Sequence, residues 1–164
     1  MNPHLTRCQA IITDAVSGIA GDAVTRRDPA KWSPAEIVEH LVRAYSGTTK
    51  GFERCLESGA SLASPLTLKQ WVAQTALIDL GYFPEGRPAP KSILPTGQLD
   101  LSALLDAVPR ELERLDQAAS RVRASLGDGK VMDHPFIGAL TVEQWLHFHE
   151  RHTEHHAEQI LRRL

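Results

Sequence analysis

Residues 141–164 read TVEQWLHFHERHTEHHAEQILRRL, a stretch with the apolar spacing of an amphipathic helix. Five of the eight histidines of the chain lie in it. At about 100° of rotation per residue, His149, His152 and His156 share one face of this helix. Side chains four residues apart lie one above the other on a helix, so His152 and His156 could both reach one metal ion. Neutral imidazole suits zinc, nickel, copper and iron.

A third imidazole is available in residues 32–41, which read WSPAEIVEHL. Ser33 and Glu36 are spaced as a capping box, in which each side chain accepts a hydrogen bond from the backbone N–H of the other residue. This pattern predicts where a long helix begins. It therefore also sets the direction of His40, on the flank of the apolar stripe of that helix.

Small residues follow His40 along the same side of this helix, namely Ala44, Gly47 and Gly51. Two interpretations of these residues remain open. They could leave room for a metal ion and its ligand, or they could let two helices pack closely together.

Helix starts are also marked at the two ends of the sequence. Asn2 can cap a first helix that has Pro3 at its first position. Thr141 and Gln144 form a second capping box, at the start of the histidine-rich helix. Apolar residues follow helical spacing nearly everywhere, and no segment reads as a convincing strand.

Two further helices are expected between these ends. Thr67 to Leu80 predicts a short amphipathic helix, whose inward face is made of apolar residues and one threonine (Leu68, Trp71, Val72, Thr75 and Ile78). Residues 105–126 carry a heptad-like apolar repeat. Pro109 lies inside this repeat, which predicts either a kink there or a helix that begins later.

A long connection separates these two helices. Residues 82–98 read YFPEGRPAPKSILPTGQ, with four prolines and two glycines, and cannot continue a helix. In a helical bundle such a segment lets the chain travel back along the helices. We therefore expect an all-α fold for residues 1–164: a single four-helix bundle domain with a long crossover connection and an extra short helix.

Composition narrows the range of partners and of cellular locations. The net charge is −2, so nucleic acid is not an expected partner. No apolar run approaches the length of a membrane span, and residues 1–9 lack the pattern of a signal peptide, so a cytoplasmic location is expected. The two cysteines, Cys8 and Cys55, fall in apolar helical patterns and are expected to be buried free thiols.

Two motifs resemble a known superfamily. WSPAEIVEHL (residues 32–41) and HTEHHAEQI (residues 152–160) resemble the second-helix and last-helix signatures of the DinB/YfiT-like four-helix bundles. RPAPKSILP (residues 87–95) and DHPFIGALTVEQW (residues 133–145) further resemble a branch of unknown function. The resemblance covers most of the chain.

The resemblance implies a site for a divalent metal ion with three histidine ligands, which are His40, His152 and His156 in this sequence. Zinc or nickel is the expected ion, while iron, manganese and copper are compatible alternatives. Three imidazoles would leave one position open for water or substrate. The implied activity is transfer of a low-molecular-weight thiol (bacillithiol, mycothiol or glutathione) to a small electrophile, a detoxification type of reaction, or metal-dependent hydrolysis.

Other residues are candidates for supporting roles around these ligands. Glu36 and Gln159 could orient the ligand imidazoles through their outer N–H groups, although Glu36 is also needed for its cap. His149 could replace either ligand of the last helix. His155 lies at the edge of the face and suits a supporting or interhelix contact. Trp145 fits the core better than a substrate platform.

No residue is identified as a catalytic acid or base. Zinc proteases carry a glutamate directly after the first histidine of the His-x-x-x-His motif, but this sequence has Thr153 at that position. Two alternatives to an enzyme remain open, a non-catalytic metal-binding module and a metal-free helical interaction module. Helices with apolar edges often pair, so a homodimer is a further expectation.

Overall fold

The computed structural model describes residues 1–17, 19, 30–84 and 88–163, and it is mostly helical. The helices are α1 (Pro3–Val16), α2 (Pro34–Ser58), α3 (Leu68–Gln74), α4 (Leu101–Leu126) and α5 (Val142–Leu161). A π-helical turn (Thr75–Asp79) extends α3, and a short 3₁₀ helix (Lys91–Ile93) precedes α4. Two antiparallel strands, β1 (Lys130–His134) and β2 (Gly138–Thr141), precede α5. None of the described helices combines the length and apolar character that crossing a membrane requires.

The predicted helix starts are confirmed. Asn2 caps α1 through its side chain. At α2, Ser33 Oγ accepts from the N–H of Glu36 (3.2 Å), and Glu36 Oε2 accepts from the N–H of Ser33 (2.8 Å). The same reciprocal pair joins Thr141 and Gln144 at α5, with both distances at 3.1 Å. The starts of the two helices that carry the candidate ligands are therefore fixed by local hydrogen bonds.

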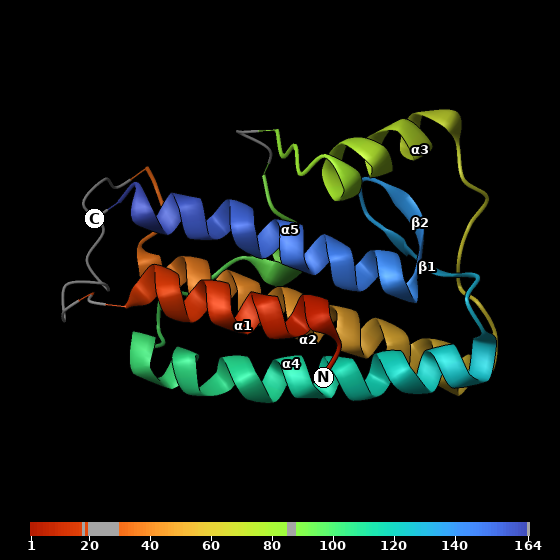
Figure 1. The fold of residues 1–164 in the computed structure, drawn as a ribbon, viewed down its shortest axis with the longest axis horizontal. Helices are drawn as coiled ribbons and strands as arrows, with labels where there is room; N and C mark the ends of the chain where they lie inside the picture. The colour runs from red at the N-terminus through yellow and green to blue at the C-terminus, as the bar shows by residue number, and fades with distance from the viewer. Residues whose placement is uncertain (18, 20–29, 85–87, 164) are drawn as a thin grey trace.

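The long helices pack in two pairs (Figure 1). Helix α2 lies along α4, and α1 lies along α5. Helices α2 and α4 run in the same direction, so residues 59–100 return across the length of the molecule to connect them. This return connection contains α3 and the 3₁₀ helix. Of the expected connection within it, residues 85–87 lie outside the described residues.

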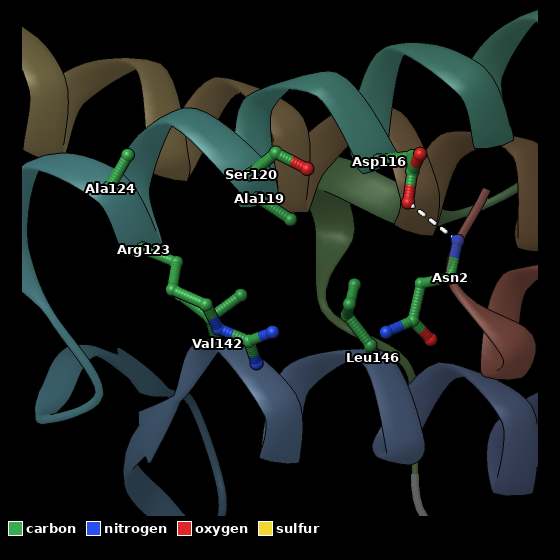
Figure 2. Close-up of a pocket in the computed structure, with 8 residues that line it drawn as sticks. All are labelled: Asn2, Asp116, Ala119, Ser120, Arg123, Ala124, Val142 and Leu146. Carbon is green, nitrogen blue, oxygen red and sulfur yellow. Dashed lines mark hydrogen bonds between the residues drawn. The ribbon is translucent and has the colours of Figure 1, made fainter.

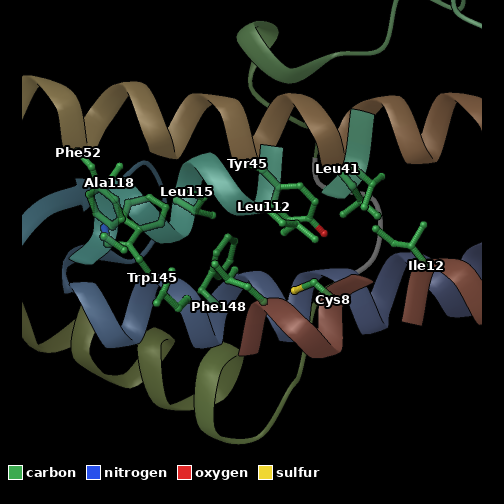
Figure 3. Packing of buried hydrophobic residues seen from close by; sticks show 14 of the residues in the cluster. Cys8, Ile12, Leu41, Tyr45, Phe52, Leu112, Leu115, Ala118, Trp145 and Phe148 are labelled. Atoms are coloured by element: carbon green, nitrogen blue, oxygen red, sulfur yellow. The ribbon is translucent and has the colours of Figure 1, made fainter. Parts of the chain in front are cut away.

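The core fills the space between these helices (Figure 3). Tyr45 and Phe52 from α2, Leu112 from α4 and Cys8 from α1 are all fully buried. Cys55 is buried as well, and both cysteines are free thiols, as the sequence predicts. Because side chains from α1, α2, α4 and α5 share one core, the positions of α2 and α5 are coupled through it.

Three of the residues predicted to face inward on α3 are exposed, so this prediction is wrong for them. Leu68, Trp71 and Val72 are 77, 57 and 55% exposed, whereas Ile78 is buried in the following π-helical turn. Only a short helix lies here, and its neighbour is the β1–β2 hairpin rather than an apolar helix face.

Gln74 donates the side-chain hydrogen bonds that join α3 to this hairpin. Its Nε2 donates to the carbonyl oxygens of Ile137 (2.8 Å) and Ala139 (2.9 Å), and the side chain is buried. The hairpin presents backbone carbonyls on this side, so an amide donor is the side chain that stabilises the contact.

The expectation that the chain has no strand is also wrong. The strands β1 and β2 have five and four residues, too few for an alternating pattern to stand out from helical spacing. Gly138 begins β2 with φ at +72°, a backbone conformation that favours glycine.

Helix α4 begins ahead of Pro109, so the helix does not start after this proline. Asp100 caps the helix by accepting from the N–H of Ala103 (2.7 Å), and α4 then runs through Pro109. The predicted later start is therefore wrong. The proline lies in the third turn, where its missing N–H removes only one helix hydrogen bond.

Candidate metal site

Three histidines from two helices converge inside the molecule. His40 is on α2, and His152 and His156 are on α5. The Nε2 atom of His152 lies 3.2 Å from Nε2 of His40 and 3.0 Å from Nε2 of His156. All three side chains are buried, and they form a group that could hold a metal ion. The structure thus brings together the three residues that the sequence predicts.

Two of the three rings are oriented by an acceptor on their outer side. Nδ1 of His40 donates to the carbonyl oxygen of Ile93 (2.9 Å). Nδ1 of His156 donates to Oε1 of Gln159 (2.9 Å). A neutral imidazole carries one proton, so a proton on Nδ1 leaves the lone pair of Nε2 free. Both lone pairs point towards His152.

His152 cannot satisfy both of these lone pairs. It has at most one proton to place on Nε2, while two acceptors face that atom. Its own Nδ1 is buried and has no hydrogen-bond partner among the described residues. A cation between the rings would accept all three lone pairs at once. With metal–nitrogen bonds of about 2.0–2.1 Å, tetrahedral ligand atoms lie roughly 3.4 Å apart, close to the separations seen here. The donor set therefore fits a divalent metal ion.

Burial keeps the three rings in the form that binds metals. Burial lowers the pKa of His40 below its usual value. Burial also lowers the pKa of His156 to about 3, a value to which the neighbouring His40 contributes in the same direction. It lowers the pKa of His152 still more strongly, helped by the adjacent His156 and His40. All three imidazoles are therefore neutral at neutral pH, with lone pairs available.

Aromatic rings cover the cluster. The ring centre of Trp32 lies 5.0 Å from that of His40, and Phe148 stacks on His152 at 5.3 Å. Phe83 lies 5.9 Å from His152 on the return connection. Sequence reasoning missed all three, although Trp32 directly precedes the capping box of α2. Apolar rings exclude water, which strengthens electrostatic interactions inside the site.

The sequence allows two interpretations of the small residues after His40, room for a metal ion or a surface for close helix packing, and neither interpretation describes their contacts fully. A Cβ atom on Gly51 would lie 2.5 Å from Sδ of Met132 in β1. Gly47 faces Ile93, the residue whose carbonyl accepts from His40. The small side of α2 therefore accommodates the hairpin and the return connection rather than another helix.

The remaining candidates lie around the cluster. Oε1 of Gln159 accepts from Nδ1 of His156 (2.9 Å), and its Nε2 donates to Nε2 of His155 (3.0 Å). The ring of His155 stacks on Phe83 at 5.2 Å and meets the ring of His156 edge-on at 5.2 Å, so it borders the cluster without belonging to the three-histidine group. Glu36 is engaged in its capping box.

His149 and Trp145 belong to the core on the hairpin side of the cluster. Nε2 of His149 contacts Oγ1 of Thr48 (2.9 Å), and the structure does not bring this ring into the three-histidine group. Nε1 of Trp145 donates to the carbonyl oxygen of Met132 (3.4 Å), and the side chain is buried. Trp145 is thus a core residue, the role that its sequence position favoured.

A second group of histidine and carboxylate side chains lies where α1 meets α5, made of His4, His147 and Glu150. Here the ring nitrogens of His4 contact carboxylates. Nδ1 pairs with Glu150, and Nε2 lies 3.1 Å from Glu143. Glu150 also pairs with Arg7 (2.8 Å). These partners explain His4 and Glu150 as members of an ion-pair network between the two helices, and the ring of His147 stacks on that of His4 at 4.6 Å.

A pocket of about 310 Å³ lies between α4 and α5 beside the start of α1 (Figure 2). Its charged side chains are paired: Asp116 accepts from the N–H of Asn2 (2.8 Å), and Arg123 contacts Glu143 (2.7 Å). On α5 it is lined by residues of the first two turns, whereas the histidine cluster lies on later turns. The pocket is therefore separate from the candidate metal site.

These features define a mostly helical protein with a buried three-histidine group that could hold a metal ion. The chain belongs to the family described as "Protein of unknown function (DUF1569)", whose model matches residues 9–163. The matched range contains all three histidines. No curated protein and no solved structure matches the chain.

Proposed function

We propose that this chain is a metal-dependent protein with the architecture of the DinB/YfiT-like four-helix bundles. In this proposal α1, α2, α4 and α5 are the four helices, α3 is the extra short helix, and residues 59–100 are the crossover. The packing of α2 along α4 and of α1 along α5 supports it. The two resembling motifs fall at the start of α2 and in the second half of α5.

The proposed ligands are Nε2 of His40, His152 and His156, with zinc or nickel as the preferred ion. One observation carries this proposal: three buried imidazole nitrogens face one another at 3.0 and 3.2 Å with at most one proton to share. A pair of histidines joined by an ordinary hydrogen bond would not leave a third lone pair directed at the same place.

The preferred activity is thiol S-transfer of the detoxification type, with hydrolysis as the variant. When bound, a divalent ion supplies a Lewis acid that lowers the pKa of a thiol or a water molecule. The chain contributes the rest: Ile93 and Gln159 orient two ligands, and Trp32, Phe83 and Phe148 keep water from the rings. Thiol transfer is preferred because the nearby carboxylate of Glu36 serves its helix cap, while hydrolysis usually needs a general base.

Metal binding is tested by titrating zinc and nickel into the chelator-treated protein. We expect about one ion per chain, with affinity reduced at least about 100-fold in His152→Ala. His147→Ala is the matched control, because it removes an α5 histidine that stacks on His4 outside the three-histidine group, and it should leave binding unchanged. A wild-type protein that binds neither ion, or that binds equally well without His152, would rule out the site.

Catalysis is tested separately on the metal-loaded protein. Glutathione and other low-molecular-weight thiols are supplied with a chromogenic aryl halide, and turnover is followed by absorbance. Thiol transfer that is lost in His40→Ala and kept in His147→Ala supports the transferase. Metal binding without turnover of thiols or of ester substrates favours the non-catalytic metal-binding module.

A further inference from the structure

The return connection takes part in the geometry of the three-histidine cluster. The 3₁₀ helix Lys91–Ile93 packs on α2, and the carbonyl oxygen of Ile93 accepts the Nδ1 proton of His40 (2.9 Å). This hydrogen bond determines which ring nitrogen of His40 carries the proton. The position of a loop carbonyl therefore controls whether the His40 lone pair faces His152.

A buried carboxylate holds this part of the connection in place. Glu39 precedes His40 on α2, and its side chain is only 2% exposed. Its Oε1 accepts from the N–H and the hydroxyl of Thr96 (2.9 and 2.8 Å), and its Oε2 accepts from the N–H of Gly97 (3.0 Å). Arg43 adds a contact to Oε1 at 3.2 Å. Three of these four donors belong to the connection, three and four residues beyond Ile93.

A glycine in the return connection also allows the chain to lie close to the start of α2. Gly97 has φ at +69°, and a Cβ atom there would lie 3.2 Å from Oε1 of Glu36. The chain can thus lie against the first turns of α2 at this point because residue 97 has no side chain. The cap of α2 is already provided by Glu36, so Glu39 is not needed to start the helix.

We propose that Glu39 is a positioning residue for the metal site. By holding Thr96 and Gly97, it fixes the Ile93 carbonyl against His40, and this keeps the His40 ring in the form with the proton on Nδ1 and the lone pair on Nε2. The consequence for metal affinity rests on the proposed function. The consequence for the His40 proton does not, since it concerns the metal-free protein.

The test compares wild-type protein with Glu39→Gln. Glutamine keeps the shape of the side chain but puts an NH₂ group where one carboxylate oxygen accepts, so a donor faces the N–H of Gly97 or the Thr96 donors. Asp100→Ala is the matched control for stability, because it removes the cap of α4, a helix that carries none of the three histidines.

Two readouts are used. The ¹⁵N chemical shifts of the His40 ring report the position of its proton in the metal-free protein, a property that a merely structural role for Glu39 would not change. Competition with a chromogenic chelator reports zinc affinity. We expect a single Nδ1–H form in wild type, a mixture of both forms in Glu39→Gln, and zinc affinity lower by about tenfold or more. Asp100→Ala should resemble wild type in both readouts.

The proposal is overturned if Glu39→Gln keeps the wild-type His40 shifts. If Glu39→Gln does not fold, Thr96→Val takes its place. This variant keeps the backbone N–H and loses the hydroxyl, so it should shift the same equilibrium by a smaller amount, and unchanged shifts overturn the proposal. If wild-type protein binds no zinc, the proposed function fails, whereas the ring shifts still decide the role of Glu39.

Discussion

The hydroxyl of Tyr45 joins α2 to α5 inside the core. Thr153 gives its single hydroxyl proton to the carbonyl oxygen of His149 (2.6 Å), so Tyr45 is the donor in its 2.6 Å contact with Thr153. Tyr45→Phe removes this donor and leaves a buried acceptor with one partner fewer. We expect a loss of about 1 kcal/mol in the free energy of unfolding, measured by urea denaturation.

Tyr82→Phe is the control for this prediction, because Tyr82 is 68% exposed. Its midpoint should match that of wild type within experimental error. Equal midpoints for both variants would mean that the buried contact contributes nothing measurable.

Gly138 is the glycine whose backbone conformation matters most for the hairpin. It has φ at +72°, and an added Cβ would lie 2.6 Å from Cδ of Gln70. We expect Gly138→Ala to lower the free energy of unfolding by about 1–2 kcal/mol, since an L-residue is strained in this conformation. Gly129→Ala, just before β1, is the matched control, because a Cβ there would meet no atom of the described residues within 4 Å. A loss of stability in the control as large as that in Gly138→Ala would contradict the explanation.

For single residues, sequence reasoning found the three clustered histidines better than their surroundings. His152 and His156 follow from helical spacing, and His40 follows from the resemblance of residues 32–41 to a second-helix signature. Ile93 could not be predicted, because it acts through a backbone carbonyl that every residue has. Glu39 has no local signature either, since its donors lie 57 and 58 positions further along the chain.

Among the elements, α3 contacts the hairpin through Gln70 and through the buried side chain of Gln74. Gln74 donates to two carbonyl oxygens of the hairpin and accepts from Lys130 Nζ (3.3 Å). Gln74→Met keeps the length of the side chain but removes both donors, so two buried carbonyls lose a partner. We expect a loss of about 2 kcal/mol and faster amide hydrogen exchange in α3 and the hairpin.

The control for this element is Gln117→Met, which changes an exposed glutamine of α4. Its exchange pattern should equal that of wild type. Unchanged exchange of α3 in Gln74→Met would show that other contacts hold the helix in place.

The helix starts could be predicted from the sequence because their contacts are local, whereas the strands could not because their contacts are not. Each cap lies within four consecutive residues, so the sequence contains all of its partners. The hairpin and the outward face of α3 are decided by contacts between distant segments, such as Gln74 with Ile137. An apolar face on a short helix therefore predicts burial only if a complementary surface reaches it, and none does at Trp71.

The whole molecule has an interior rich in neutral histidines, which makes its stability depend on pH. Burial lowers the pKa of His149 and of His156 from 6.5 to about 3. Below a pH of about 6.5 the unfolded chain therefore binds protons that the folded protein does not bind. The contribution of each ring is complete above that pH and is lost as the pH falls towards about 3, at about 1.4 kcal/mol per pH unit.

We accordingly expect the metal-free protein to lose about 2 kcal/mol for each of His149 and His156 between neutral pH and about pH 5. Urea midpoints measured in the presence of a chelator provide the test. His149→Phe should show a shallower dependence, because one titrating group has been removed. Identical midpoints at both pH values would mean that these rings are protonated equally in the folded and unfolded states.

His40 and His152 are 112 positions apart in the chain, and this separation has a consequence during synthesis. At about 5–20 residues per second, a ribosome needs roughly 6–22 seconds to travel from one histidine to the other. Throughout that interval α2 lacks the helix that supplies the other two imidazoles, and α1 lacks its packing partner. The three-histidine group and the core shared by α1 and α5 can therefore form only after α5 has been translated.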